Sequence, residues 1–541
     1  MIDFQYKLPR KKVEGKRVGQ YNNPELLLPG LLTTSDFRLG EFLHLLHNVV
    51  ADERRLLFID GQVISCCHNW IRDHVHMMKA FRHWDYKLKS FLQFIIEKQT
   101  EEGFYFELVK QLDDAHHTFV DSSCAQIYEE DNVALTRLEL EADVEYLVVE
   151  GCWQYYRATG DFEWIKTVID SLEKAINYMT SSPKRWDKEH GLVIRPFTID
   201  TWDFTSGKNA GLDRRIHEDE PMSAMHGDNS GVYAAMKILA FFREKMGDSE
   251  KAKEWESRAE SLKENMFRYL WNGDFFIHQF HINHKGLDDK ENIRLSLSNG
   301  YDMNRGVTNL MQSRKIIEEY LRRRETTDAF AEWFSIDPPY EKFSIYPPGQ
   351  YVNGGISPFT AGEVARAAFE NGYEEYGWDI IKRLMEICEE EKTLSFLYAP
   401  SGKERENGTG PSGWGAASLL NAIDEGLAGV VDKDCLYKVI DFSPRFVVTH
   451  YTELRYFTGY ECTERFIDIR FIINEQGMRY DILSKAEQIN AHILLPKGKT
   501  CKELYVNGEK TNFVNNRIAD SNYVDVSVKG EKHLKFEILF A

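Results

Sequence analysis

Several stretches of the chain combine carboxylates, amides and aromatic rings in patterns that suit chemistry on a polar ligand. The first, TWDFTSG at 201–207, places Asp203 between Trp202 and Phe204. Aromatic neighbours lower the local polarity, which disfavours the charged form of a carboxyl group and raises its pKa. A carboxylic acid that keeps its proton near neutral pH can act as a general acid. We therefore predict that Asp203 donates a proton; the alternative is an aspartate that caps a turn between core aromatic residues.

The second stretch, CHNWIRDHVHMMKAF at 67–81, begins a helix with Arg72 and Asp73 beside Trp70. Paired polar groups next to a flat aromatic face are typical of sugar-binding sites. In this interpretation Arg72 and Asp73 bind hydroxyl groups while Trp70 stacks on the sugar ring. The alternative is purely structural, with Asp73 capping the helix and Arg72 pairing with it.

Two further loops carry amides and acids ahead of helices. YPPGQYVNGGISPFTAGEVARAA at 346–368 presents Gln350 and Asn353, although loop geometry alone would also explain this stretch. The segment at 398–429 places Glu404 and Glu406 before a helix that opens near Trp414, and the alternative for both glutamates is a solvated surface loop. A proton donor, a second carboxylate, amides and aromatic platforms together are what glycoside cleavage requires.

Composition narrows the possible functions. The chain has 541 residues, 43% hydrophobic content and a net charge of −19, which predicts a large core with at least one smaller domain and argues against nucleic-acid binding. No apolar run suits a signal peptide or a membrane span, so we expect a cytoplasmic protein whose eight cysteines are reduced thiols. Histidines and cysteines lack metal-ligand spacing, so neither a metal nor another cofactor is predicted.

Helical periodicity dominates the chain as far as residue 440. Helices pair through short turns at Gly160, Gly247 and Gly372, whereas the pairs are joined by long connections at 100–133, 183–222, 270–304, 325–359 and 392–412. Hairpins without a fixed repeat favour a closed ring over a solenoid, with the long loops gathered at one end. We predict a mainly α fold, an (α/α)6 toroid over 34–440, on which an N-terminal extension, 1–33, packs.

After residue 440 the pattern changes to two-residue alternation of β-branched and aromatic residues, with a turn signal at Asn507-Gly508. We predict a small antiparallel β-sandwich over 441–541.

The ordered motifs resemble those of the six-hairpin (α/α)6-barrel glycosidases, the group that includes trehalase, processing α-glucosidase I, mannosylglycerate hydrolase and glucoamylase. WIRDH at 70–74 resembles their element that holds the terminal sugar, TWDFTSG resembles the trehalase element whose aspartate is the general acid, and GTGPSGWGAASLLNAIDEGLAG at 408–429 resembles their closing glycine-rich helix. The resemblance implies that Asp203 is the acid and that Arg72, Asp73, Trp202 and Trp414 contact substrate.

The sequence departs from this group at the base. In trehalase and its relatives the base is a glutamate two residues before a tyrosine; here the tyrosine is Tyr398 and Phe396 stands at that position. Glu404 and Glu406 are the candidate replacements, with Glu363 and Glu220 as further possibilities. We expect an exo-acting, inverting hydrolase that releases a terminal sugar from a small oligosaccharide or glycoside, an α-glucoside, α-mannoside or α-L-rhamnoside.

Two alternatives remain. Related (α/α)6 phosphorylases use inorganic phosphate and need no base, and Lys403 and Arg405 could serve a phosphate. The other alternative is a sugar-binding relative that has lost activity. The sequence carries no indication of oligomeric state.

Overall fold

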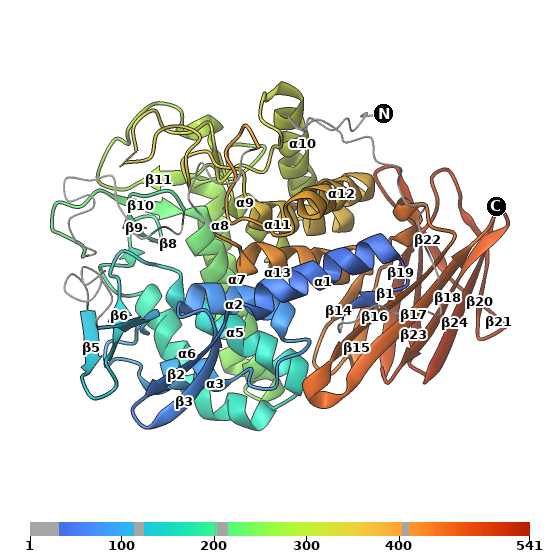
Figure 1. Ribbon diagram of the computed structural model, residues 1–541, viewed down its shortest axis with the longest axis horizontal. Coiled ribbons are helices and arrows are strands. Elements are labelled where there is room, and N and C mark those ends of the chain that lie inside the picture. The colour runs from blue at the N-terminus through green and yellow to red at the C-terminus, as the bar shows by residue number, and fades with distance from the viewer. Residues whose placement is uncertain (1–31, 113–123, 201, 203–214, 344, 403–409) are drawn as a thin grey trace.

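The computed structural model describes residues 32–112, 124–200, 202, 215–343, 345–402 and 410–541. Two parts lie side by side in Figure 1, a helical part and a region of long strands. The helices are α1 Phe37–Ala51, α2 Ile71–Phe81, α3 Ser90–Glu97, α5 Val144–Thr159, α6 Phe162–Met179, α7 His226–Lys245, α8 Ser249–Tyr269, α9 Ser298–Asn304, α10 Leu310–Thr326, α11 Pro358–Glu370, α12 Glu374–Glu391 and α13 Gly413–Asn421.

The predicted helical hairpins are present. Helix α5 ends at Gly160, whose φ of 66° lies in the left-handed region that glycine adopts readily. Helix α6 follows at once, because the Asp161 side chain accepts a hydrogen bond from the Trp164 backbone N–H at 3.1 Å and caps the new helix. The pairs α7–α8 and α11–α12 also turn at glycines with positive φ, Gly247 and Gly372.

Small sheets between the helices were missing from the prediction. Strands β2 Arg54–Ile59 and β3 Gln62–Cys67 form a hairpin between α1 and α2. Strands β4 Leu108–Gln111, β5 Cys124–Tyr128 and β6 Val133–Arg137 form a second sheet, and β9 Arg195–Pro196, β10 Met222–Met225 and β11 Gln279–His281 a third. The strands of the second and third sheets lie in or beside the long connections and are too short for a clear alternation pattern. The shortest pairs are β7 Trp186–Asp187 with β8 Leu192–Val193, and β12 Leu295–Ser296 with β13 Ile336–Asp337.

The predicted C-terminal β region is confirmed as two packed sheets, drawn in orange and red in Figure 1. The seven-stranded sheet has the order β1 Thr33–Thr34, β16 Glu453–Tyr460, β17 Arg465–Ile473, β18 Gly477–Ser484, β24 His533–Phe540, β20 Cys501–Val506 and β21 Glu509–Thr511. The five-stranded sheet has the order β14 Val430–Asp432, β15 Val439–Phe442, β19 Gln488–Leu494, β23 Ser521–Lys529 and β22 Val514–Ile518. All strand pairs are antiparallel except β15 with β19.

Aromatic side chains fill the space between the two sheets. Phe442 of β15 meets Tyr480 of β18 edge to face, with ring centroids 5.7 Å apart. Asn507 and Gly508 turn β20 into β21 with φ angles of 51° and 85°, as the sequence predicted. The region begins earlier than residue 441, because β14 already pairs with β15.

The predicted N-terminal extension, 1–33, lies almost entirely outside the described residues. Its last residue, Thr33, begins strand β1, which pairs with β16 through Phe457 and Tyr456. This end of the extension therefore pairs with the β region, and the packing of 1–33 on the helical part stays a prediction, because residues 1–31 lie outside the described ranges.

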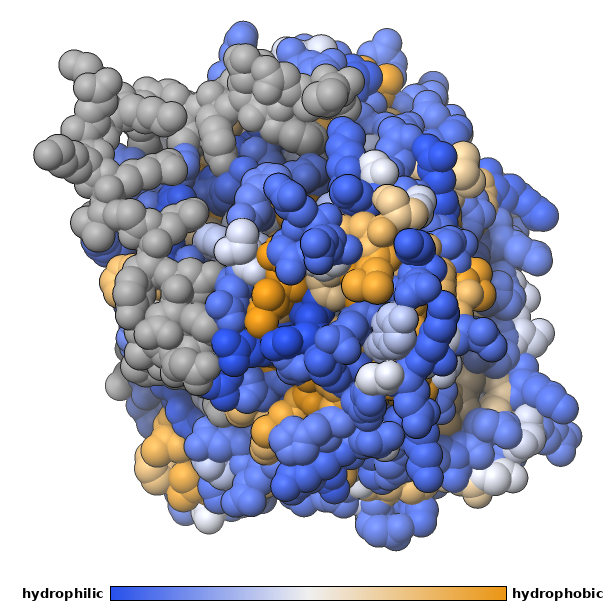
Figure 2. All heavy atoms as spheres, turned by 90° about the vertical axis from the view of Figure 1, so that its right-hand side faces the viewer, coloured by the Kyte–Doolittle hydropathy of each residue, from blue (hydrophilic) through white to orange (hydrophobic). Residues whose placement is uncertain are grey.

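The face of the molecule that carries the β region is largely hydrophilic (Figure 2). No helix among the described residues is long and apolar enough to cross a membrane. All eight cysteines fall within the described ranges and none of them forms a disulfide.

Candidate active site

A cavity of about 450 Å³ opens where several of the long connections meet the start of α2. This volume falls within the range of small-molecule sites. Five of the seven predicted substrate contacts line it, although they come from three distant parts of the sequence. The described lining residues are Glu53, His68, Trp70, Arg72, Asp73, Met77, Trp202, Tyr351, Phe396, Gly410, Pro411, Ser412, Gly413 and Trp414.

Arg72 is held at the cavity by two buried carboxylates. Its Nε donates to Asp143 Oδ2 at 2.5 Å and its Nη2 donates to Asp143 Oδ1 at 2.9 Å, while Nη2 also contacts Glu141. The side chain is 8% exposed, so these partners fix it in one orientation. Bidentate pairing of this kind leaves the guanidinium rigid where it borders the cavity.

Asp73 faces His68, a residue that was not predicted to belong to the site. His68 Nδ1 lies 3.9 Å from Asp73 Oδ2, and His68 has a φ of 69°. A left-handed backbone at a non-glycine residue is uncommon and costs energy. His68 and Asp73 therefore form a polar corner of the cavity.

Glu53 is a second lining residue that sequence reasoning missed. It precedes the β2–β3 hairpin and His68 follows it, and the hairpin brings them together through a hydrogen bond from His68 N to Glu53 O at 2.9 Å. The signal in the sequence is Asp60-Gly61, a two-residue turn pair between the strand-forming runs 54–59 and 62–67.

Trp202 forms an aromatic wall with two residues from other loops. Its ring centroid lies 4.9 Å from that of Tyr351 and 5.7 Å from that of Phe396, the latter edge to face. Asp203 and Phe204, which follow it, lie outside the described residues. Of the predicted acid loop, 201–207, the structure thus describes Trp202 alone, together with the preceding chain as far as Asp200.

Trp414 contributes an edge to the cavity. Its ring is stacked between His76, at 4.1 Å, and Phe359, at 4.6 Å. Its indole N–H donates to the Tyr301 hydroxyl at 2.7 Å, and only 6% of the residue is exposed. Because both faces are covered, a ligand in the cavity can meet only the rim of this ring.

The helix that carries Trp414 begins in a tightly packed corner of the cavity. Ser412 caps α13 by accepting a hydrogen bond from the Gly415 N–H. A Cβ atom on Gly413 would lie 2.2 Å from the Met77 sulfur and 3.0 Å from Cγ of Glu53. Glycine at 413 therefore lets the loop before α13 approach α2 and the β2–β3 hairpin.

Gln350 and Asn353 do not line the cavity, in contrast to the prediction. Asn353 is fully buried, and its amide accepts from Tyr340 N at 2.9 Å and donates to Tyr340 O at 2.8 Å and Tyr346 O at 2.9 Å. These bonds tie the loop to itself. Gln350 is exposed and pairs with Asn353 only through the backbone. The amide side chains therefore build the loop that presents Tyr351.

None of the four candidate bases is among the described residues that line the cavity. Glu404 and Glu406 lie outside the described residues, as do Lys403 and Arg405. Glu363 and Glu220 are described and buried, and neither lines the cavity; Glu363 instead contacts Lys79 and Asn304. Phe396 lines the cavity at the position where the resembling group has its base. The described lining carries two carboxylates, Glu53 and Asp73.

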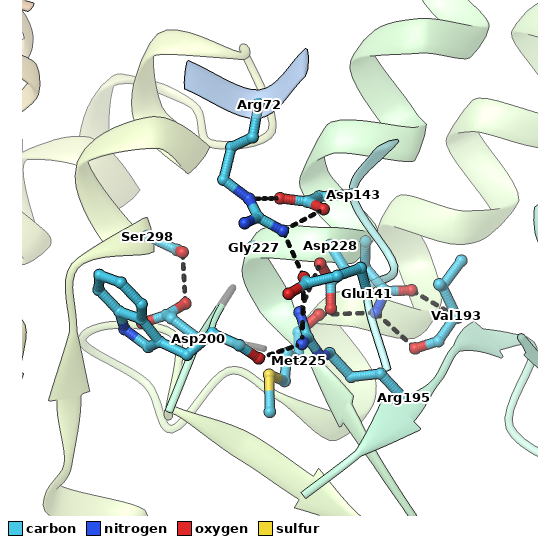
Figure 3. A network of polar contacts seen from close by, with 12 residues as sticks. Arg72, Glu141, Asp143, Val193, Arg195, Asp200, Met225, Gly227, Asp228 and Ser298 are labelled. Carbon is cyan, nitrogen blue, oxygen red and sulfur yellow. Dashed lines mark hydrogen bonds and ion pairs between the residues drawn. The ribbon is translucent and has the colours of Figure 1, made fainter. Parts of the chain in front are cut away.

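Behind the cavity lies a network of buried charges (Figure 3). Arg195 Nη2 donates to the Trp202 carbonyl oxygen at 2.6 Å and to Glu141 Oε2 at 3.4 Å. Its Nη1 lies 4.0 Å from Asp228 Oδ1. Burial raises the pKa of Asp228 to about 6, against the opposing effect of Arg195. Sequence reasoning missed this network, whose one signal is an arginine among apolar residues in VIRPF at 193–197.

Asp200 anchors the same loop from its other side. Its carboxylate accepts a hydrogen bond from the Ser298 hydroxyl at 2.5 Å, and its backbone N–H is bonded to His278 Nε2 at 3.2 Å. Burial raises the pKa of Asp200. The segment that leads to Trp202 is therefore fixed at both Asp200 and Trp202. Within the ranges that the structure describes, no group of three or more histidine, cysteine or acidic side chains could hold a metal ion.

Comparison with known proteins finds one family match and several structures of similar fold. A protein-family model described as Trehalase matches residues 213–335. No curated protein sequence matches the chain. Among solved structures, the GH78 family rhamnosidase of Bacillus sp. GL1 aligns with a TM-score of 0.57 and 14% identity over 86% of this chain and 43% of that one.

Two further structures show the same likeness. The α-L-rhamnosidase of Streptomyces avermitilis, complexed with L-rhamnose, aligns with a TM-score of 0.55 and 11% identity over 94% of this chain and 42% of that one. A protein described as a sialidase aligns with a TM-score of 0.57 and 13% identity over 95% of this chain and 43% of that one. This chain thus spans less than half the length of each of these proteins.

At such identities the structural likeness concerns the fold. Together with the trehalase family match, it confirms the resemblance to the six-hairpin glycoside hydrolase group that the sequence motifs indicated. The neighbouring structures are named for different sugars, so the fold by itself assigns no substrate.

Proposed function

We propose that the protein is an exo-acting glycoside hydrolase that cleaves with inversion, built on an (α/α)6 toroid. The observation that carries this proposal is the meeting of Trp70, Arg72, Asp73, Trp202 and Trp414 around one cavity. They come from the three motifs by which the chain resembles six-hairpin glycosidases. Such a convergence of aromatic and hydrogen-bonding groups suits the terminal ring of a sugar.

In the proposed mechanism Asp203 protonates the departing glycosidic oxygen while a carboxylate activates water on the opposite face of the sugar. Glu404 and Glu406 are the proposed bases, and Glu53 is an additional candidate because it lines the cavity. An inverting pair requires carboxyl groups about 6.5–9.5 Å apart, to leave room for the water. No metal or other cofactor takes part in this scheme.

The described residues suggest how the sugar is held. Arg72 is oriented by Asp143 and Glu141, and Asp73 stands beside His68, so both can hydrogen-bond hydroxyl groups from fixed positions. Trp70 and Trp202 offer aromatic surface. We propose an α-glucoside, α-mannoside or α-L-rhamnoside as the terminal residue of a small oligosaccharide or glycoside, and a cytoplasmic location for the enzyme.

One observation favours a second candidate, a glycoside phosphorylase. Phe396 places an aromatic ring in the cavity wall at the position of the expected base, and a phosphorylase needs no base there. A phosphate nucleophile would need cations, whereas the Arg72 charge is already matched by Glu141 and Asp143. Lys403 and Arg405 could supply cations, but the same stretch of sequence carries Glu404 and Glu406 as candidate bases, so hydrolysis is the preferred proposal and a sugar-binding protein without turnover is the third outcome.

A substrate panel separates the three. The purified protein is incubated with aryl glycosides and disaccharides of glucose, mannose and rhamnose, with and without inorganic phosphate. Release of free sugar in phosphate-free buffer supports hydrolysis, strict dependence on phosphate supports phosphorolysis, and binding without turnover removes the enzyme proposal.

A substitution at the proposed acid completes the test. Asp203→Asn removes the proton donor, and we expect a loss of at least 10²-fold in kcat on an unactivated glycoside, with unchanged circular dichroism. The matched control is Asp289→Asn, a substitution at an exposed aspartate, which should leave turnover unchanged. Full activity of Asp203→Asn would end the assignment of this residue as the acid.

A further inference from the structure

Glu141 is shared by two arginines that serve different parts of the cavity. Its Oε2 accepts from Nη2 of Arg72, at the sugar-binding side, and from Nη2 of Arg195 at 3.4 Å. Glu141 and Arg195 are fully buried and Arg72 nearly so. One carboxylate therefore sets the relative position of both guanidinium groups (Figure 3).

The second contact of Arg195 reaches the backbone of the proposed acid loop. Its Nη2 donates to the Trp202 carbonyl oxygen at 2.6 Å. That carbonyl is part of the peptide group that joins Trp202 to Asp203, and a peptide group is planar. The hydrogen bond therefore holds this peptide group at its Trp202 end.

The geometry of arginine suits this double role. A guanidinium presents several N–H donors in a rigid planar fork, whereas a lysine ammonium is a point charge on a flexible stem. The single Nη2 of Arg195 joins Trp202 O to Glu141, and Nη1 points its charge toward Asp228 at 4.0 Å. A shorter, more flexible cation would keep the charge but lose the simultaneous contacts.

We infer that Arg195 is a positioning residue which, through the shared carboxylate of Glu141, holds the Trp202–Asp203 peptide in register with the sugar-binding Arg72. The inference rests on the proposed function, because it assigns Arg195 a role in aligning the general acid. Arg195 itself does not line the cavity.

Leaving-group dependence tests this role. Protonation matters greatly for a sugar or alkyl leaving group and little for dinitrophenolate, which departs as an anion. For Arg195→Lys we expect kcat on a disaccharide or alkyl glycoside to fall about 100-fold and kcat on a dinitrophenyl glycoside to fall less than about 5-fold, since general-acid catalysis contributes roughly 10²–10⁴-fold. KM should change less than about 3-fold in both cases, because Arg72 is untouched.

A second variant tests the sharing of the carboxylate. Glu141→Gln removes the charge that holds both arginines, so it should raise KM for both substrates as well as reproduce the leaving-group effect. The control is Arg185→Lys, at an equally buried arginine whose Nη2 bonds to the Glu139 carbonyl oxygen instead of the Trp202 loop. Arg185→Lys should affect both leaving groups equally.

The outcomes separate the inference from the proposed function. An inactive wild-type protein on the whole substrate panel removes both. An active wild type with an equal loss on both leaving groups in Arg195→Lys overturns the inference alone and leaves the hydrolase. Should Arg195→Lys fail to fold, Glu141→Gln decides, because an unchanged leaving-group ratio in that variant also overturns the inference.

Discussion

The indole of Trp414 lies flat against the imidazole of His76, with ring centroids 4.1 Å apart and planes 8° apart. The stack joins α13 to α2, the two helices whose first residues border the cavity. Burial lowers the pKa of His76 well below its usual range, so the imidazole is neutral and contributes flat packing without charge. The most conspicuous aromatic ring of the glycine-rich motif is therefore a structural link as well as part of the cavity.

Replacing Trp414 with phenylalanine should separate packing from substrate contact. Phenylalanine keeps the stack between His76 and Phe359 but loses the hydrogen bond to the Tyr301 hydroxyl, which should lower the free energy of unfolding by about 1–3 kcal/mol. Since only the ring edge reaches the cavity, KM should rise less than about 3-fold. Urea denaturation and steady-state kinetics measure the two effects. A large rise in KM with unchanged stability would contradict this division of roles.

The helical hairpins and the C-terminal strands could be predicted because they depend on local sequence patterns. Five of the residues that line the cavity were predicted from the order of the motifs along the chain. Gly160 and Asp161 are by themselves sufficient to predict one hairpin turn. Trp70 and Trp202 were predicted to lie together because their motifs follow the same order along the chain as in the six-hairpin glycosidases. Periodicity by itself would not have brought them to one cavity.

What sequence reasoning missed depends on tertiary placement. Glu53 and His68 meet only because a hairpin folds between them, and an isolated glutamate and histidine carry no local signal. Asn353 was misjudged because an amide in a loop suits either a ligand or the loop itself, and only its three bonds decide. Arg195 belongs to a network whose partners are distant in sequence, so its burial could not be inferred.

Asn353 provides a test of that correction. Asn353→Ala removes three hydrogen bonds from a buried loop, those to the Tyr340 N–H, the Tyr340 carbonyl and the Tyr346 carbonyl. We expect a loss of about 2–4 kcal/mol in unfolding free energy, since each unsatisfied buried group costs roughly 1–3 kcal/mol and loops relax in part. KM measured well below the melting temperature should change little. A selective rise in KM at full stability would restore Asn353 as a sugar contact.

Asp228 should make the protein less stable as pH rises through the acid range. Burial raises its folded pKa to about 6, with Asp143 and Asp200 adding to the shift and Arg195 and Arg185 opposing it. The folded state therefore holds this proton more tightly than the unfolded state, and the resulting stability is lost between about pH 4 and pH 6.

Asp228→Asn removes that dependence. The variant should gain about 3 kcal/mol over wild type at pH 7.5, and the two should become nearly equal near pH 4. Chemical denaturation across this range measures the difference, and Asp170→Asn, at an exposed aspartate, is the control substitution. A destabilised Asp228→Asn at pH 7.5 would show that the ionised carboxylate is needed by Arg195.

His74 should make the stability of the protein depend on pH in the opposite direction. Its Nδ1 accepts the Cys67 backbone N–H at 3.0 Å, and burial lowers its pKa to about 3. The unfolded state binds a proton near pH 6.5 and the folded state does not, so stability falls as pH drops below about 6.5, by up to about 1.4 kcal/mol for each pH unit.

Asn at this position keeps an acceptor where Nδ1 stands and cannot be protonated. We expect His74→Asn to lose some packing energy at pH 7.5 against Phe81 and Phe91, whose rings lie 5.0 and 5.2 Å from the imidazole. Between pH 6.5 and pH 4.5, however, its stability should decline more slowly than that of wild type, by a difference of about 2–3 kcal/mol in total. Parallel stability curves for the two proteins over this interval would mean that His74 already carries its proton in the folded state. The bond from Cys67 would then have to be remade through another acceptor, because a protonated imidazole has no lone pair on Nδ1 to offer.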